Sequence, residues 1–265
     1  MERSPTNKYE RDINKDKQVF LEAISSFSIE EIQTSFDELA VQKLANNLEA
    51  NKLFILGEMH GVKENVNVIY TLFKKFGFRR LALEWEPKLK AVVDKFLELG
   101  ELDFDPIKGS PDGRITAGHF ALIKKLKSEG MLEQIVCFDE GSDGADWNKR
   151  DLNMSKNILA NLSDAPTLVV AGNLHARIGP MTFDDEPDQQ HPMGENVKKI
   201  IPIISSGKIE YLTGQFHNFG TQEFWKFPEG EMLSEARFYQ DEDGLYVYKI
   251  PEAHIATVPN PDERI

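Results

Sequence analysis

The chain contains very little cysteine, with Cys137 alone among its 265 residues. A single thiol excludes a disulfide within the chain, which is typical of proteins from a reducing compartment. Cys137 also lies inside the apolar run 134–138, and burial in apolar surroundings keeps a thiol protonated and inert. We therefore predict that Cys137 is a packing residue and that any chemistry uses other side chains.

Long apolar runs are missing as well. Residues 1–17 are polar and charged, and they lack the apolar h-region of a signal peptide. No window of the sequence approaches the roughly 20 apolar residues that a membrane-spanning helix needs. We expect a cytoplasmic protein that makes no use of a membrane.

Positive charge is scarce relative to negative charge. The chain carries 31 Lys and Arg residues against 44 Asp and Glu residues, so its formal net charge is -13 at pH 7. A negative field of this kind repels the phosphate backbone of nucleic acids and the surface of anionic membranes. The expected partner is a small-molecule or peptide substrate, with neither nucleic acid nor membrane involved.

Several common catalytic motifs are absent from the sequence. It has no Gly-x-Ser-x-Gly nucleophile elbow, no phosphate-binding P-loop, no Gly-x-Gly-x-x-Gly and no His-Glu-x-x-His. These absences exclude the usual serine hydrolases, P-loop NTPases, Rossmann oxidoreductases and zincin metalloproteases. An active site must therefore be built from other residues.

Short apolar segments alternate with amphipathic segments of helical period over most of the chain. Residues 53–57, 80–84, 134–139 and 167–173 have the composition of buried strands. Continuous apolar strands that alternate with helices are typical of a parallel sheet covered on both faces. We predict an α/β fold with a mainly parallel central sheet and helices on both of its faces.

The two ends of the chain differ from this regular pattern. The polar residues 1–16 are expected to form a mobile leader, and residues 17–265 a single α/β domain. The core of this domain covers about 50–205, and an irregular C-terminal cap covers about 206–255. Within the cap, alternating apolar and polar residues flank the turn-like sequence 241–244, which predicts a β-hairpin.

Acidic and histidine side chains follow three of the predicted strands. A Gly-Glu-Met-His sequence ends the first strand at 57–60, and a Gly-Asn-Leu-His sequence ends the last at 172–175. Between them, Glu84 and Glu86 follow the strand that begins at Arg80. Ligands of open α/β sheets bind beyond the carboxyl ends of the strands, so we predict an active site at this edge.

The predicted catalytic residues are Glu58, His60, Glu84 and His175. Residues two apart in an extended segment point the same way, so Glu58 and His60 project together. Converging carboxylates repel each other unless a cation lies between them. A divalent metal such as Mn, Fe, Co or Zn, bound by all four residues, would supply that cation. Without a metal, the same Glu and His side chains would act as a general base on water.

Four further residues are predicted to contact the substrate because they lie near these strand ends in the sequence. Glu86 points to the same side as Glu84, and Asp139 ends a further strand. Arg80 and Arg177 lie beside the predicted catalytic residues along the chain.

The order of four short sequences resembles that of a known superfamily: LGEMH, LALEWEP, RDLNMSKNI and VVAGNLHAR. The superfamily includes erythromycin esterase-like proteins, ChaN-like haem-binding proteins, and the TIKI and TraB proteins. The resemblance covers about residues 50–200. The family's two Gly-x-x-His motifs match 57–60 and 172–175, its strand-end Glu matches Glu84, and the acid before its first His matches Glu58.

The resemblance implies different activities in different branches. TIKI-like members are metal-dependent proteases, and esterase-like members hydrolyse a macrolide lactone with Glu and His residues. ChaN-like members bind haem and are lipoproteins, whereas this chain has no lipobox cysteine. The chain is also short for an erythromycin esterase, which does not favour a macrolide as its substrate.

Residues and resemblance together predict a hydrolase of an ester, lactone or amide/peptide bond. The alternative is a ChaN-like protein that binds haem or iron without turnover. In that case His60 or His175 would be the axial ligand, and the aromatic C-terminal segment would flank the porphyrin.

Overall fold

The computed structural model describes residues 13–110, 112–141, 146–183, 186–218, 221–226 and 233–259. The helices are α1 (Ile13–Ser26), α2 (Glu38–Asn51), α3 (Asn65–Phe76), α4 (Leu89–Leu99), α5 (Ala117–Ser128), α6 (Trp147–Ala160) and α7 (Met193–Lys198). The strands are β1 (Thr34–Phe36), β2 (Leu53–Glu58), β3 (Arg80–Leu83), β4 (Gln134–Cys137), β5 (Thr167–Gly172), β6 (Met181–Phe183), β7 (Glu186–Gln190), β8 (Ser205–Asn218), β9 (Thr221–Lys226), β10 (Ala236–Gln240) and β11 (Tyr246–Ala253).

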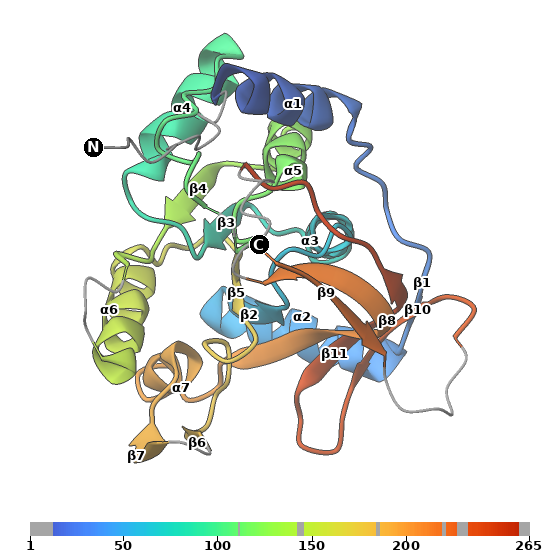
Figure 1. The fold of residues 1–265 in the computed structure, drawn as a ribbon. Coiled ribbons are helices and arrows are strands. Elements are labelled where there is room, and N and C mark those ends of the chain that lie inside the picture. Colours follow the sequence, from blue (N-terminus) through green and yellow to red (C-terminus); the bar gives the residue numbers. More distant parts are fainter. Residues whose placement is uncertain are drawn as a thin grey trace.

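The predicted α/β fold with a mainly parallel central sheet is confirmed (Figure 1). The strand order is β1-β10-β11-β8-β2-β5-β3-β4, and β9 pairs with the far end of β8. The pairs β2–β5, β5–β3, β3–β4, β2–β8 and β8–β11 are parallel. The predicted C-terminal hairpin is formed by β10 and β11, which pair antiparallel.

Both faces of the sheet are buried, which explains the continuous apolar composition of its strands. In β2, Phe54 and Leu56 pack into a large core together with side chains of α1 to α5. Leu53 and Ile55 point to the opposite face, where they pack with side chains of α6 and α7. Helices therefore cover the sheet on both sides, with the smaller layer formed by α6 and α7.

Two helix ends determine how the chain enters and leaves the sheet. Helix α3 ends at Gly77, whose positive φ of 68° is easily reached only without a side chain, and the Gly77 N–H donates to Phe73 O. Helix α6 begins after Asp146, whose carboxylate accepts a hydrogen bond from the Lys149 N–H. This cap fixes the first turn of α6 beside the carboxyl ends of the strands.

The structure differs from the predicted organisation at both ends of the chain. Residues 13–16, predicted as part of the leader, form the first turn of α1, and residues 1–12 lie outside the described part. The segment predicted as a cap instead extends the central sheet, because β8 pairs in parallel with both β2 and β11. No helix in the described ranges is long and apolar enough to cross a bilayer.

Candidate active site

A cavity of about 1040 Å³ opens at the carboxyl ends of β2, β5, β3 and β4. Glu58, His60, Glu84 and His175 all line this cavity, and so does Asp139. The strands are parallel, so their carboxyl ends share one edge, and residues separated by up to 117 positions meet there. The sequence placed these five residues at the correct edge of the sheet.

His60 lies between two carboxylates. Its Nδ1 is 3.1 Å from Glu58 Oε1, and its Nε2 is 3.5 Å from Glu84 Oε2. Glu58 and Glu84 come from β2 and the end of β3, which are not neighbours, because β5 lies between them. The contact across β5 depends on Gly172, where an added Cβ would lie 3.1 Å from His60 Nε2 and 3.6 Å from Glu84 Oε2.

The first glycine of the other Gly-x-x-His motif has a matching role. A Cβ at Gly57 would lie 2.7 Å from Asn173 Oδ1 and 3.1 Å from the Ala176 Cβ. Each motif therefore uses its glycine to let the residues of the other motif approach closely. The two loops pack against each other, and this contact sets the distance between His60 and His175.

The two carboxylates keep His60 protonated. Burial alone would lower the pKa of His60, but the negative charge of Glu84 and the hydrogen bonds with Glu58 and Glu84 raise it to about 10. The His60 side chain is 22% exposed and faces the cavity. At neutral pH it is therefore an imidazolium that can donate a proton to a bound molecule but cannot accept one.

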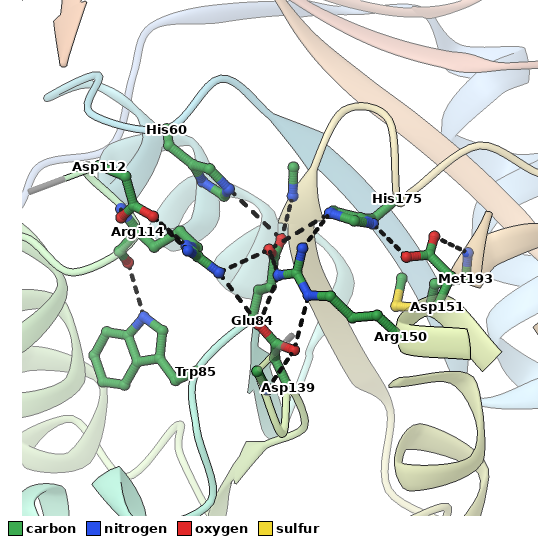
Figure 2. A network of polar contacts seen from close by, with 12 residues as sticks. His60, Glu84, Trp85, Asp112, Arg114, Asp139, Arg150, Asp151, His175 and Met193 are labelled. Atoms are coloured by element: carbon green, nitrogen blue, oxygen red, sulfur yellow. Dashed lines mark hydrogen bonds and ion pairs between the residues drawn. The ribbon is translucent and has the colours of Figure 1, made fainter. Parts of the chain in front are cut away.

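Glu84 connects the two halves of the site (Figure 2). Its Oε2 accepts a hydrogen bond of 2.7 Å from the Gly172 N–H, and its Oε1 accepts one of 2.9 Å from Arg150 Nη2. Burial would raise the pKa of Glu84, but the positive charge and hydrogen bond of His60 and the positive charge of Arg114 hold it well below its usual value. Glu84 is therefore a permanently charged anchor rather than a base.

Two arginines link Glu84 to Asp139. Arg150 donates to Asp139 through Nη2 at 2.7 Å and through Nε at 3.2 Å. Arg114 Nη1 lies 3.2 Å from Asp139 Oδ2 and 3.5 Å from Glu84 Oε1. The Arg114 guanidinium is itself held by Asp112, at 2.5 Å. Buried carboxylates and guanidinium groups thus alternate along one wall of the cavity.

His175 is held by contacts on both ring nitrogens. Its Nδ1 is 2.7 Å from Asp151 Oδ1, and its Nε2 is 3.3 Å from Arg150 Nη1 and 3.7 Å from Glu84 Oε1. The Trp147 ring stacks on the imidazole at 4.3 Å between ring centroids, with 11° between the planes. The second carboxylate oxygen of Asp151 accepts a hydrogen bond of 2.7 Å from the Met193 N–H.

The predicted metal site at Glu58, His60, Glu84 and His175 stays a prediction. Among the described residues, no group of three or more His, Cys, Asp and Glu side chains is placed so that it could hold an ion. His60 lies between Glu58 and Glu84, and the guanidinium groups of Arg150 and Arg114 lie between Glu84 and Asp139. The four residues are therefore best described by their hydrogen bonds and ion pairs.

Three of the predicted substrate contacts are placed differently from the expectation. Glu86 reaches only the rim of the cavity, where it is 48% exposed and paired with Lys88, because the chain turns after β3. Arg80 starts β3 and lies at the opposite end of the strand, where it donates to Ser163 and Gln134. Arg177 lines a separate cavity of about 570 Å³ beside β8. Arg80 and Arg177 are thus not part of the central site.

Sequence reasoning missed four residues of the site: Arg114, Trp147, Arg150 and Asp151. Arg114 comes from a loop, and no local pattern marks it. Trp147, Arg150 and Asp151 are spaced i, i+3 and i+4, which places them on one face of a helix. That spacing, in the helix just before the strand of the second Gly-x-x-His motif, was a usable signal.

No family model and no curated protein sequence matches this chain. Among solved structures, a His-to-Asn variant of the erythromycin esterase EreC in its open conformation matches with a TM-score of 0.61 and 11% identity, over 84% of this chain and 96% of that one. The chain therefore shares its fold with this erythromycin esterase.

Two further structures share this fold. A succinoglycan biosynthesis protein matches with a TM-score of 0.59 and 10% identity, over 91% of this chain and 98% of that one. A Bacillus cereus protein matches with a TM-score of 0.57 and 10% identity, over 94% and 99%. The resemblance first seen in the motifs is therefore supported by the fold over nearly the whole length of the chain.

Proposed function

We propose that this protein is a hydrolase of an ester, lactone or amide/peptide bond that uses two imidazoles as its acid and base. The observation that carries the proposal is the chain of contacts Glu58–His60–Glu84–His175–Asp151 at the carboxyl end of the sheet. It places two imidazoles against opposite oxygens of one buried carboxylate in a cavity large enough for a substrate. The shared fold with an erythromycin esterase supports the same class of reaction.

The two histidines take different roles because their surroundings differ. His60 lies between two carboxylates that keep it protonated, so it is the proton donor. His175 lines the cavity, its Nε2 lies near Arg150 and Glu84, and Asp151 occupies its Nδ1. His175 is therefore the general base that accepts a proton from water.

The reaction then follows from these roles. His175 Nε2 takes a proton from a water molecule as the water oxygen forms a bond to the acyl carbon of the substrate. The carbonyl oxygen becomes negatively charged, and the positive charges of His60 and Arg114 stabilise it. The bond from the acyl carbon to the leaving group breaks, and His60 gives its proton to the leaving oxygen or nitrogen. The products are a carboxylic acid and an alcohol or amine, and transfer of the proton from His175 to His60 restores the starting protonation of both imidazoles.

The buried acids hold this charge distribution in place. Glu84 touches both imidazoles, so it stabilises the imidazolium on His60 before the reaction and on His175 after it. Asp139 pairs with Arg150 and Arg114, and these ion pairs keep the two guanidinium groups in place while the charge of the substrate changes. A preorganised site of this kind does not need to reorient its charges during the reaction.

The haem-binding alternative is less favoured by the same contacts. An axial ligand needs an imidazole nitrogen with a lone pair, but the carboxylates keep His60 protonated, and an iron at His175 Nε2 would have to displace Arg150. We expect no Soret shift when haemin is added, and a shift that disappears in His175→Ala would favour the alternative instead.

The experiment that tests the proposal is a panel of chromogenic esters, lactones and peptide amides, measured with the purified wild type and the His60→Ala/His175→Ala double variant. We expect the wild type to hydrolyse at least one ester and the double variant to hydrolyse none above the buffer rate. The assay is run with and without a chelator, which tests the predicted metal separately from the two imidazoles. If the two proteins have equal activity on every substrate, the proposal is wrong.

A further inference from the structure

The first turn of α6 contacts His175 on three sides. Trp147, Arg150 and Asp151 share one helix face by their spacing, and the Asp146 cap fixes this turn. Trp147 covers the face of the imidazole, Arg150 lies at its Nε2, and Asp151 lies at its Nδ1. Figure 2 shows the Arg150 and Asp151 side chains reaching His175 from this helix.

Asp151 is fully buried, and each of its oxygens has one partner. Oδ2 accepts from the Met193 N–H at the start of α7, and Oδ1 lies 2.7 Å from His175 Nδ1. A carboxylate can only accept hydrogen bonds, so Nδ1 must carry a proton. The position of Asp151 itself is fixed by the backbone of α7 rather than by another mobile side chain.

The contact with Arg150, on the opposite side of the ring, indicates the same tautomer of His175. A guanidinium can only donate, so the nitrogen that it approaches at 3.3 Å must offer a lone pair. That nitrogen is Nε2. Two neighbouring residues of one helix therefore select the same tautomer of His175, with the proton on Nδ1 and the lone pair on Nε2.

Trp147 adds a constraint on orientation. The indole lies nearly parallel to the imidazole at 4.3 Å, so the ring cannot rotate out of the line between Asp151 and Glu84. The face of an indole also attracts a cation, which favours the imidazolium that forms when His175 takes a proton.

We propose that Asp151 and Trp147 are positioning residues that fix His175 in the tautomer and orientation needed for a general base. The assignment of His175 as base rests on the proposed hydrolase function, whereas the tautomer does not. Asp151 determines which nitrogen is basic, and Trp147 determines where that nitrogen points. Helix α6 thus supplies the support for a histidine that belongs to a different loop.

The test is the Asp151→Asn variant, which has nearly the shape of the native residue. Its single amide oxygen must accept from the Met193 N–H, so its NH₂ group is turned toward His175 Nδ1 and donates to it. The proton on the ring then moves to Nε2. With nitrogen-15-labelled histidine, long-range proton–nitrogen spectra should show the Nδ1–H tautomer in the wild type and the Nε2–H tautomer in the variant, with His175 assigned from His175→Gln.

The control is Asp164→Asn, an exposed aspartate before β5, which should leave the tautomer of His175 unchanged. Trp147→Leu should retain the Nδ1–H tautomer but broaden the His175 resonances as the ring gains freedom. An Nε2–H tautomer in the wild type, which needs no variant to fold, overturns the proposal. Unchanged spectra in a folded Asp151→Asn protein overturn it as well.

Activity on a chromogenic ester separates this proposal from the function on which it rests. If the wild type hydrolyses the ester, Asp151→Asn should reduce kcat by up to about 10⁴-fold with little change in KM, as expected for a wrong tautomer. Inversion of the tautomer with kcat unchanged contradicts the role of His175 as base. A wild type without any ester activity contradicts the hydrolase function and leaves the tautomer result standing.

Discussion

Replacing either His60 or His175 by alanine is expected to reduce kcat/KM by about 10²–10⁴-fold, the usual effect of losing a general acid or base. His60→Ala removes the proton donor for the leaving group, and His175→Ala removes the acceptor of the proton from water. Both residues lie at the cavity and outside the two apolar cores, so the variants should fold. The measurement is steady-state kinetics on a substrate from the panel.

The double variant should be hardly slower than either single variant, because residues that act as one unit have non-additive effects. His254→Ala is the control, since His254 is exposed and paired with Glu64 away from the cavity, and its activity should equal that of the wild type. Wild-type kcat/KM in His60→Ala would show that the site is assigned wrongly.

Glu84→Gln is expected to lower the free energy of unfolding by about 3 kcal/mol at neutral pH, the lower end of the range for breaking a buried ion pair. The variant leaves the positive charges of His60 and Arg150 facing a neutral amide. The loss is at the lower end because His60 is still paired with Glu58, and Arg150 is still paired with Asp139. Urea unfolding followed by circular dichroism measures the difference.

The matched control is Glu86→Gln, two residues further along and paired with Lys88 at the surface. An exposed ion pair contributes at most about 1 kcal/mol, so this variant should be nearly as stable as the wild type.

The pKa of Glu84 is depressed in the folded state, so its charge stabilises the fold above its usual pKa of 4.5, and this contribution is lost as the pH falls below it. The difference between wild type and Glu84→Gln should therefore shrink in acid, and equal stabilities at pH 7 would contradict the account.

The strands and the edge that carries the site could be predicted because both depend on local sequence. The apolar segments around residues 53–57 and 167–173 have buried side chains on both faces, and no other element type suits a run of that length. Glu58, His60, Glu84 and His175 follow such segments directly. In a parallel sheet the end of a strand determines the edge, so these residues were placed correctly without knowledge of the strand order.

The strand order itself could not be predicted from local patterns. The strands that end at Glu58 and Glu84 follow each other in the sequence, but β5 lies between them and pairs with both. His60 and Glu84 then meet over Gly172 at the end of β5, where a Cβ would crowd the imidazole at 3.1 Å from Nε2. Arg80 was misplaced for a related reason, since a residue near Glu84 in the sequence lies at the other end of the same strand.

The C-terminal part could not be assigned because its pairing is distant in sequence. Strand β1, of three residues, pairs with β10, about 200 positions later. Strand β8 starts beside β2 and continues to Phe216 and His217 at the cavity, so one strand serves both the sheet and the site. Local composition contains no information about such partners.

The central claim is that His60 gives a proton and His175 takes one. The pH dependence of kcat/KM tests it most directly, because this quantity reports the ionisation of groups in the free enzyme. The carboxylates raise the pKa of His60 to about 10, so kcat/KM on a confirmed ester should fall as the pH rises through that value and His60 loses its proton. His60→Gln should lack this decrease, and the rate of the double alanine variant gives the background to subtract. A wild-type kcat/KM that stays level or keeps rising through pH 10, as hydrolysis without an acid at His60 would require, contradicts the account.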